Sequence, residues 1–159
     1  MTELISYDID NDKRFRNALD KAIKEVEDLR FPMGEISRDI FKNTMKNFIL
    51  KGTGKYPPLN PKYAAYKNKV KPSAPILVFS GRLRDSVTGS GNNESIINIG
   101  KESLVQGTQV PYAAALQKGS SRGMPERKYY FIDEAQAGRF ERILMNYVTA
   151  KAEALGDVS

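Results

Sequence analysis

The 159-residue chain contains no cysteine, no histidine and no tryptophan. Without cysteine it can form neither a disulfide nor a thiolate metal site. Without histidine it lacks the usual imidazole general base, the His-dependent catalytic triads and the commonest metal ligand. These absences exclude most familiar hydrolase mechanisms, and the sequence predicts no catalytic residue, no metal site and no cofactor.

Long hydrophobic runs are also absent. No apolar stretch approaches the roughly 18 residues that a membrane-spanning helix needs. The first residues, Met1 to Leu4, lack the basic and then apolar layout of a signal peptide. We therefore expect no membrane partner and a protein that stays in the cytosol where it is made.

Positive charge is concentrated in the middle of the chain. The formal net charge is +6, and residues 51–71 contain six lysines without one acidic residue. Lysines interleaved with tyrosines could follow a phosphate backbone and stack on bases. Lysine runs also serve solubility, and lysine without arginine disfavours bidentate base reading.

A second basic segment spans residues 118–128. The composition of residues 119–125 predicts a mobile loop that orders on a partner. For Arg127 an internal salt bridge or a carbonyl contact is at least as plausible as a partner. The candidates for basic residues that face DNA or a partner are Lys51, Lys55, Lys62, Lys67, Lys69, Lys71, Lys118, Arg122, Arg127 and Lys128.

The length predicts a single domain, 1–159. Alternation predicts a short strand over 5–9, and apolar spacing predicts one helix over about 12–30 and a second over 33–49. Pro32 is expected to interrupt the two helices, and Gly52 is expected to end the second.

A basic, proline-rich arm is predicted over 51–75. Its five prolines favour an extended loop with at most a short helix near 63–67. A strand is expected over 76–79. Ser80 is expected to cap a short helix in which Leu83 and Val87 share one face.

The rest of the chain predicts a hairpin, a short helix and a long helix. The hairpin pairs 97–99 with 104–106, and the short helix begins at Tyr112 and ends at Gly119. A strand over 129–132 should precede a capping box at Asp133 and Gln136, followed by a helix to about Leu155 with Gly156 as its terminator. The predicted fold class is α+β: a small antiparallel sheet packed with N-terminal helices and a long C-terminal helix, with extended loops or arms.

Four clusters between residues 56 and 129 carry most information. Each pairs a turn residue with an aromatic or apolar anchor and none holds a reacting group, as expected of an assembly protein that places loops and not of an enzyme. In chain order they are Pro58-Leu59 with Tyr63 and Lys67; Ser80-Gly81-x-Leu83-x-x-Ser86; Gly107-Thr108 with Tyr112-Ala113 and Gln117-x-Gly119; and Pro125-x-Arg127-x-Tyr129.

In order and spacing these clusters resemble the phage virion morphogenesis or tail completion family, which includes the Mu G-type and S-type tail completion proteins. The resemblance covers about 52–132. Tyr56 stands where a tryptophan is common in the family, with Pro57 inserted before Pro58, and Ser80 stands where threonine is common. A histidine often stands beside or in place of Gln117.

The resemblance implies a non-enzymatic virion protein that finishes the tail or joins it to the head. It implies a homo-oligomeric ring of six or twelve copies around the DNA channel, at the head-tail junction or the head-proximal tail end. Its partners would be neck, portal-side adaptor and tail proteins, with non-specific contact to packaged DNA, and it would be made in the host cytoplasm. The candidate interface or core anchors are Tyr56, Tyr63, Tyr112 and Tyr129.

A stand-alone basic nucleic-acid-binding domain is the alternative. It would explain the pI of about 9.4 and the lysine-tyrosine arm. It predicts salt-sensitive DNA binding by the isolated protein, whereas a ring subunit should bind little DNA alone.

Overall fold

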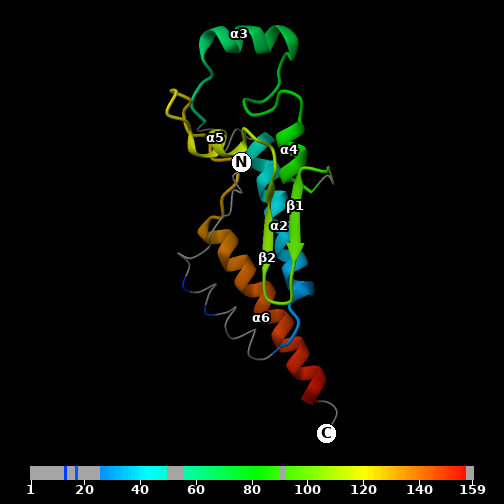
Figure 1. Cartoon of the computed structure of the whole chain (residues 1–159). Helices are drawn as coiled ribbons and strands as arrows, with labels where there is room; N and C mark the ends of the chain where they lie inside the picture. Colours follow the sequence, from blue (N-terminus) through cyan, green and yellow to red (C-terminus); the bar gives the residue numbers. More distant parts are fainter. Residues whose placement is uncertain (1–12, 14–16, 18–25, 50–55, 90–91, 157–159) are drawn as a thin grey trace. The chain divides into compact units, whose positions relative to one another are not determined.

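The computed structural model describes residues 13, 17, 26–49, 56–89 and 92–156. In this part of the chain there are helices and one two-stranded antiparallel sheet, which confirms the predicted α+β class (Figure 1). No helix in it is long and apolar enough to cross a membrane. The elements are α2 (Arg30–Ile49), α3 (Pro61–Val70), α4 (Arg82–Val87), β1 (Ser95–Ile99), β2 (Leu104–Thr108), α5 (Ala113–Lys118) and α6 (Glu134–Gly156).

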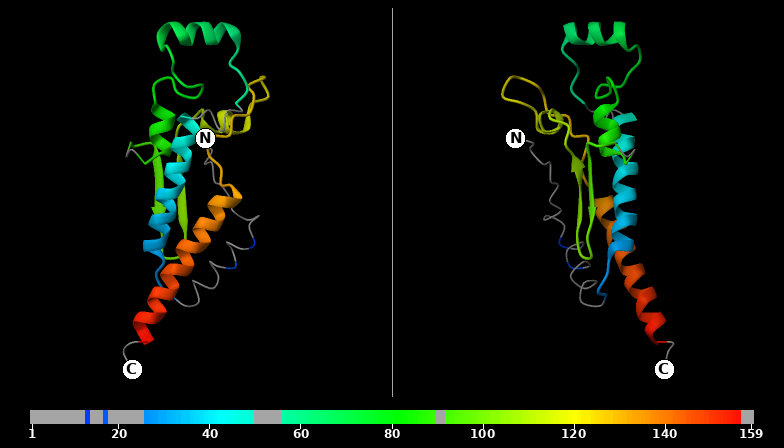
Figure 2. Two further views of the ribbon diagram at one scale, coloured as in Figure 1. Left: turned by 180° about the vertical axis from the view of Figure 1, so that it is seen from behind. Right: turned by 45° about the vertical axis from the view of Figure 1, so that its right-hand side comes forward.

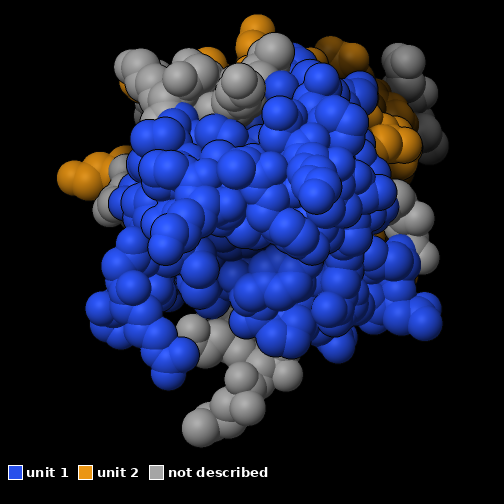
Figure 3. Space-filling model, turned by 90° about the horizontal axis from the view of Figure 1, so that it is seen from above, with its two compact units in different colours: residues 1–6, 41–96, 106–131 blue, residues 7–40, 97–105, 132–159 orange. Residues whose placement is uncertain are grey.

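The chain divides into two compact units, coloured separately in Figure 3. The boundaries between them fall within α2 and within the β1–β2 hairpin, so neither unit is a separate stretch of sequence. The predicted single domain over 1–159 stays a prediction. Unit 1 comprises residues 1–6, 41–96 and 106–131, and unit 2 comprises residues 7–40, 97–105 and 132–159.

Unit 2 contains the first half of α2 and the whole of α6, whose ribbons Figure 2 shows, and each buries a stripe of apolar side chains. Arg139 on α6 forms an ion pair with Asp39 on α2 at 3.0 Å, and the rings of Phe31 and Tyr147 stack with centroids 5.7 Å apart. Apolar residues three and four positions apart bury one face of each helix. They are Met33, Ile36 and Ile40 on α2, with Leu29 directly before it, and Ala137, Phe140, Leu144 and Val148 on α6.

The long last helix forms as its sequence predicts. Asp133 accepts a hydrogen bond from the Gln136 backbone N–H at 2.7 Å, so it satisfies one of the free donors at the start of α6. The helix ends at Gly156, the predicted terminator. The hairpin is also confirmed, and its turn is closed by a hydrogen bond from Gly100 N–H to the Ser103 carbonyl at 2.8 Å.

The beginning of α2 corrects the sequence-based expectation. Residues 26–29 are not helical, and α2 starts at Arg30 with Pro32 in its first turn. A proline fits there because its missing N–H would have no intrahelical acceptor. Pro32 therefore helps to begin this helix and does not separate two helices. The predicted strand over 5–9, most of the predicted helix over 12–30 and Gly52 lie outside the described residues.

Two strand predictions are wrong. Residues 76–79 form turns and bends, and residues 129–132 form no strand. Both runs are apolar, but side chains bond to the Ile76 carbonyl and to the backbone of Tyr129 and Tyr130, and the Val78 N–H closes a local turn to the Pro75 carbonyl. Gly81 occupies the N-cap position of α4 in the left-handed region at φ 89°, and the Ser80 hydroxyl, one residue earlier, accepts from the Arg82 N–H at 3.3 Å, so Ser80 still supplies the capping hydrogen bond. Leu83 and Val87 are both buried, as predicted.

Candidate partner-binding site: an arm held by polar contacts

The second and third sequence clusters meet in the interior of unit 1. Ser86 on α4 and Thr108 at the end of β2 lie 2.7 Å apart between their hydroxyl oxygens, and both are buried. Ser86 donates to the Leu83 carbonyl at 2.8 Å, which makes Thr108 the donor to Ser86. Thr108 in turn accepts from the Val110 backbone N–H at 3.1 Å. Both hydroxyls therefore bond to groups inside the unit, and the pair connects α4 to the end of β2.

Gln117 joins the third cluster to the fourth. From α5 its side-chain oxygen accepts from the backbone N–H groups of Tyr129 and Tyr130, both at 3.2 Å. Its amide nitrogen donates to the Tyr130 carbonyl at 2.5 Å. Asn47 on α2 donates to the Tyr129 carbonyl at 3.0 Å. These side chains take the place of a strand ladder, which explains why the apolar run after Lys128 forms no strand.

Tyr129 is the aromatic centre of unit 1. Its side chain is fully buried, with its ring 5.3 Å from that of Phe48, and its hydroxyl donates to the Ala113 carbonyl at 3.3 Å. Burial raises the pKa of both Tyr129 and Tyr130. Of the four candidate tyrosine anchors, the structure places this one in the core.

Arg127 joins the fourth cluster to the first. Its guanidinium donates from Nε to the Pro57 carbonyl at 3.2 Å and from Nη2 to the Pro58 carbonyl at 2.9 Å. Tyr56 adds a hydrogen bond from its hydroxyl to the Lys128 carbonyl at 3.0 Å. Burial lowers the pKa of Arg127 and raises the pKa of Tyr56 to about 12. The near end of the arm is therefore fastened to the segment that precedes the core tyrosine.

Lys67 on α3 fastens the far end. Its ammonium donates to the carbonyls of Pro75 and of Ile76, the latter at 2.9 Å. Burial and then the charge of Arg127 lower its pKa. These contacts hold residues 75–76 against α3 and occupy the Ile76 carbonyl, which a strand over 76–79 would have offered to a neighbour. We call residues 56–80 the α3 arm, and we call the contacts of Lys67 and Arg127 its clasp.

The α3 arm presents an almost uncovered helix. Asn60 caps α3 by accepting from the Lys62 N–H at 3.0 Å, and Lys67 is its single buried residue. The exposed side of the arm is aromatic: Tyr66 stacks on Phe79 with ring centroids 6.3 Å apart. Isolated helices of about ten residues are marginal in water, so α3 depends on the clasp. Its exposed apolar residues are Tyr63, Tyr66 and Val70.

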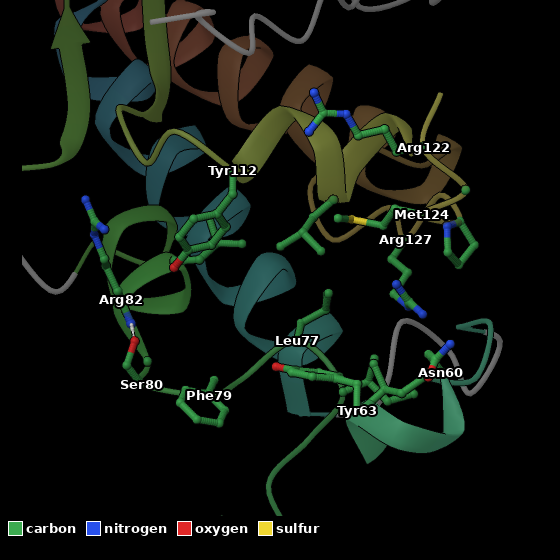
Figure 4. A pocket seen from close by; sticks show the side chains of 17 residues that line it. Asn60, Tyr63, Leu77, Phe79, Ser80, Arg82, Tyr112, Arg122, Met124 and Arg127 are labelled. Carbon is green, nitrogen blue, oxygen red and sulfur yellow. Dashed lines mark hydrogen bonds between the residues drawn. The ribbon is translucent and has the colours of Figure 1, made fainter. Parts of the chain in front are cut away.

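A cleft of about 620 Å³ opens beside the α3 arm in unit 1 (Figure 4). Its walls come from residues 59–63, 76–83, 112–116 and 122–127. Tyr63, Phe79, Tyr112 and Met124 line it and remain 37 to 42% exposed. Cavities of this size, mostly apolar with a few polar groups, are typical of binding sites.

A glycine and a folded-back loop shape one wall of this cleft. Gly119 has φ 77°, and a Cβ there would lie 2.9 Å from the Met124 carbonyl oxygen. The turn is closed by a hydrogen bond from Ser120 N–H to the Met124 carbonyl at 2.9 Å. Glycine is required because both the conformation and the close approach exclude a side chain. The predicted mobility of this loop stays a prediction.

The predicted basic residues fall into three groups. Lys67 and Arg127 are 4% and 5% exposed and donate to carbonyls of this chain, so their charged groups are engaged inside the protein, and Arg127 also lines the cleft. For Arg127 the carbonyl contact is the outcome. Lys51 and Lys55 lie outside the described residues. The exposed ones are Lys62, Lys69, Lys71, Lys118, Arg122 and Lys128, and Lys128 lies 3.2 Å from Glu126.

The remaining tyrosine anchors lie at the surface. Tyr56 is half-buried against the arm, whereas Tyr63 and Tyr112 stand on the cleft at 42% and 41% exposure. The sequence did not reveal that Asn47, Thr108 and Gln117 hold the segments together. Thr108 and Gln117 belong to the third sequence cluster, which indicated that they matter. The cluster does not show which backbone groups they bind.

In this structure the residues of the four sequence clusters fix the backbone of unit 1, and the α3 arm and the cleft expose apolar side chains. This is the arrangement of a structural protein that assembles with others. The phage virion morphogenesis family model matches residues 10–149. The chain belongs to this family, and the resemblance seen in its sequence is confirmed. No curated protein and no solved structure matches the chain. The family is one of structural and morphogenesis proteins, so this protein has a role in building the phage virion.

Proposed function

We propose that the protein is a tail completion or head-tail connector subunit that forms a closed ring around the DNA channel. The observation that carries this proposal is the α3 arm, in which a helix with a single buried residue is fixed in place by two buried cations. A helix that is held firmly while it exposes Tyr63, Tyr66 and Val70 to solvent is suited to contact a neighbouring subunit.

Ring closure supports this use of the arm. In a cyclic ring each subunit makes a heterologous contact, in which one surface meets a different surface of the next copy. Tyr66 and Val70, at 55% and 46% exposure, supply the apolar centre that such a contact needs. Lys62, Lys69 and Lys71 surround them as a charged rim.

Counting copies in purified particles tests the proposal. Quantitative mass spectrometry should give a fixed ratio of this protein to the dodecameric portal, either one or one-half. Absence from finished particles would contradict a structural role at the neck or tail end and would leave an assembly factor or a DNA-binding protein.

A variant links that count to the arm. Val70→Asp should leave the isolated protein folded, because Val70 is exposed, but it should reduce incorporation into particles by at least about tenfold, equivalent to roughly 1.4 kcal/mol. Asn146→Asp, on the exposed side of α6 in unit 2, is the matched control. Equal incorporation of both variants would show that the α3 face is not a subunit contact.

The nucleic-acid alternative rests on the same arm. Three exposed lysines lie beside Tyr63 and Tyr66, a combination that can hold phosphates and stack bases. Duplex and single-stranded oligonucleotides titrated at two salt concentrations separate the two functions. Binding by the isolated protein that falls steeply with salt would favour the alternative, and negligible binding near 0.15 M salt would favour the ring.

A further inference from the structure

The cleft beside the α3 arm combines an apolar interior with positive charge. Aromatic and aliphatic side chains form most of its surface, and Figure 4 shows Tyr63, Leu77, Tyr112 and Met124 around a common space. Arg82, Arg122 and Arg127 also line it, and no carboxylate does among the residues that the structure describes. Large apolar side chains that stay this exposed around one hollow mark a site for a partner.

The three arginines differ in how their charge is neutralised. Arg82 is held by Glu94, with 2.7 Å between Nε and the carboxylate, and its guanidinium lies 6.0 Å from the Tyr112 ring centroid. Arg127 is held by carbonyls alone, and so is Lys67 behind the same wall. Within the described ranges neither of these two buried cations has a carboxylate partner, so the wall keeps a net positive field.

The two buried cations are of like charge and close enough to act on each other. Burial and then the charge of Arg127 lower the pKa of Lys67. Carbonyl oxygens offer partial charges and leave the formal charges uncancelled. A carboxylate brought to the exposed Arg122 at the rim would be attracted both directly and by this field.

The shape of the cleft favours a peptide over a nucleic acid. The exposed lysines of the arm, Lys62, Lys69 and Lys71, are not among its lining residues. A phosphate backbone is bound by rows of cations along a groove, whereas a concave apolar hollow with charges at its edge suits one large side chain flanked by acidic ones.

We propose that the cleft binds a segment of a partner protein that carries one large apolar side chain flanked by acidic residues. The apolar side chain enters between Tyr63, Tyr112 and Met124, and its acidic neighbours pair with Arg122 at the rim. The proposal goes beyond the ring, because it names the chemistry of a partner and does not depend on copy number. It can fail while the particle count holds, and the reverse is also true.

Titration of the ¹⁵N-labelled full chain with synthetic heptapeptides tests it. The probes are Asp-Glu-Gly-Phe-Gly-Glu-Asp and its leucine-centred counterpart. They should shift the backbone amide signals of residues 76–83 and 112–126 with a Kd below about 1 mM, which corresponds to roughly 4 kcal/mol of binding. A serine-centred peptide and a peptide with lysine for every acidic residue are the controls and should shift neither segment.

Matched protein variants separate the cleft from general charge. Arg122→Glu should weaken binding by at least about tenfold, because it reverses the one exposed arginine at the rim without an ion pair in the described structure. Lys69→Glu, an exposed cation outside the lining, and Arg142→Glu, on α6 of unit 2, carry the same charge change and should keep most of the affinity.

Five results would overturn the proposal. The first four are no binding by any acidic peptide, equal binding by the serine or lysine controls, equal weakening by Lys69→Glu, and stronger displacement of the same signals by a ten-nucleotide oligothymidine. Concentration-dependent broadening of the cleft signals without peptide would also overturn it, since a second copy would then fill the cleft.

Discussion

The two units of this protein differ in the kind of contact that stabilises each of them internally. In unit 2 the stabilising contacts are apolar stripes at helical spacing, with Phe140 and Leu144 fully buried. In unit 1 the segments are joined mainly by single side chains that bond to distant backbone groups, such as Gln117 to Tyr129 and Tyr130. Periodic apolar packing along helices stabilises a scaffold. Single side-chain hydrogen bonds to the backbone fix the conformation of irregular loops, which have no regular hydrogen-bond pattern of their own.

Charge differs between the units as well. Among the described residues unit 1 has twelve basic and three acidic side chains, whereas unit 2 has seven and nine. The net charges are therefore +9 and −2. Positive charge coincides with the exposed aromatic residues of the α3 arm and the cleft, so the recognition surface and the scaffold belong to different units.

The largest expected effect is in the scaffold. Phe140→Ala removes a fully buried ring from the stripe of α6 and should lower the free energy of unfolding by about 3–5 kcal/mol. Urea denaturation followed by circular dichroism measures it. Arg142→Ala, two residues further along α6 at an exposed position, should change it by less than about 0.5 kcal/mol. A small loss at Phe140 would show that apolar packing does not dominate unit 2.

A smaller loss is expected at the main joint of unit 1. Gln117→Ala leaves two backbone N–H groups and one carbonyl of residues 129–130 without their partner, at a cost of about 1–3 kcal/mol. Hydrogen exchange should speed up most at those amides. Gln109→Ala, an exposed glutamine, is the control. Unchanged exchange at Tyr129 and Tyr130 would contradict the role of Gln117 as a joint.

The difference between the units explains what the sequence predicts well. Elements stabilised by their own periodic apolar residues, α6 and most of α2, are found within a few residues of their predicted bounds. The hairpin and α5 also form as expected, since local turn residues such as Gly119 define their ends. Local information suffices wherever the stabilising partners repeat along the same element.

Where the partner is a single distant side chain, sequence reasoning fails. Residues 76–79 and 129–132 have strand composition, but Lys67 bonds to the Ile76 carbonyl, and Gln117 and Asn47 bond to the backbone of Tyr129 and Tyr130. Nothing in the composition of an apolar run shows that a buried cation or amide will bind it. The clasp of the α3 arm is not predicted for the same reason. In the sequence Lys67 and Arg127 resemble ordinary surface charges, and only the structure shows that they bond to backbone carbonyls.

The clasp can be loosened without unfolding the protein. Lys67→Met removes the bonds to Pro75 and Ile76 but also the repulsion from Arg127, so global stability should change by less than about 1.5 kcal/mol. Local opening of the arm should rise about tenfold, which chymotrypsin cleavage at Tyr63 or Tyr66 reports. Lys69→Met, exposed on the same helix, should leave cleavage unchanged. Equal cleavage of both variants would show that Lys67 does not hold the arm.

The smallest expected effect is a pH-dependent change in stability caused by Tyr56 at the near end of the arm. Burial raises the pKa of Tyr56 to about 12, above its ordinary value of 10.0. The stability from this shift is fully present below about pH 10, because there Tyr56 is protonated in both states. Between about pH 10 and pH 12 the unfolded chain releases the proton while the folded chain keeps it, so stability falls as pH rises.

Tyr56→Phe tests this contribution directly. At pH 7 the variant should lose about 0.5–1.5 kcal/mol with the hydrogen bond to the Lys128 carbonyl. Above pH 10 its stability should fall less steeply than that of the parent, which narrows the difference between them. Tyr66→Phe, on the exposed face of α3, is the matched loss of a phenol. If Tyr66→Phe flattens the alkaline decline as much as Tyr56→Phe does, burial against the arm is not its cause.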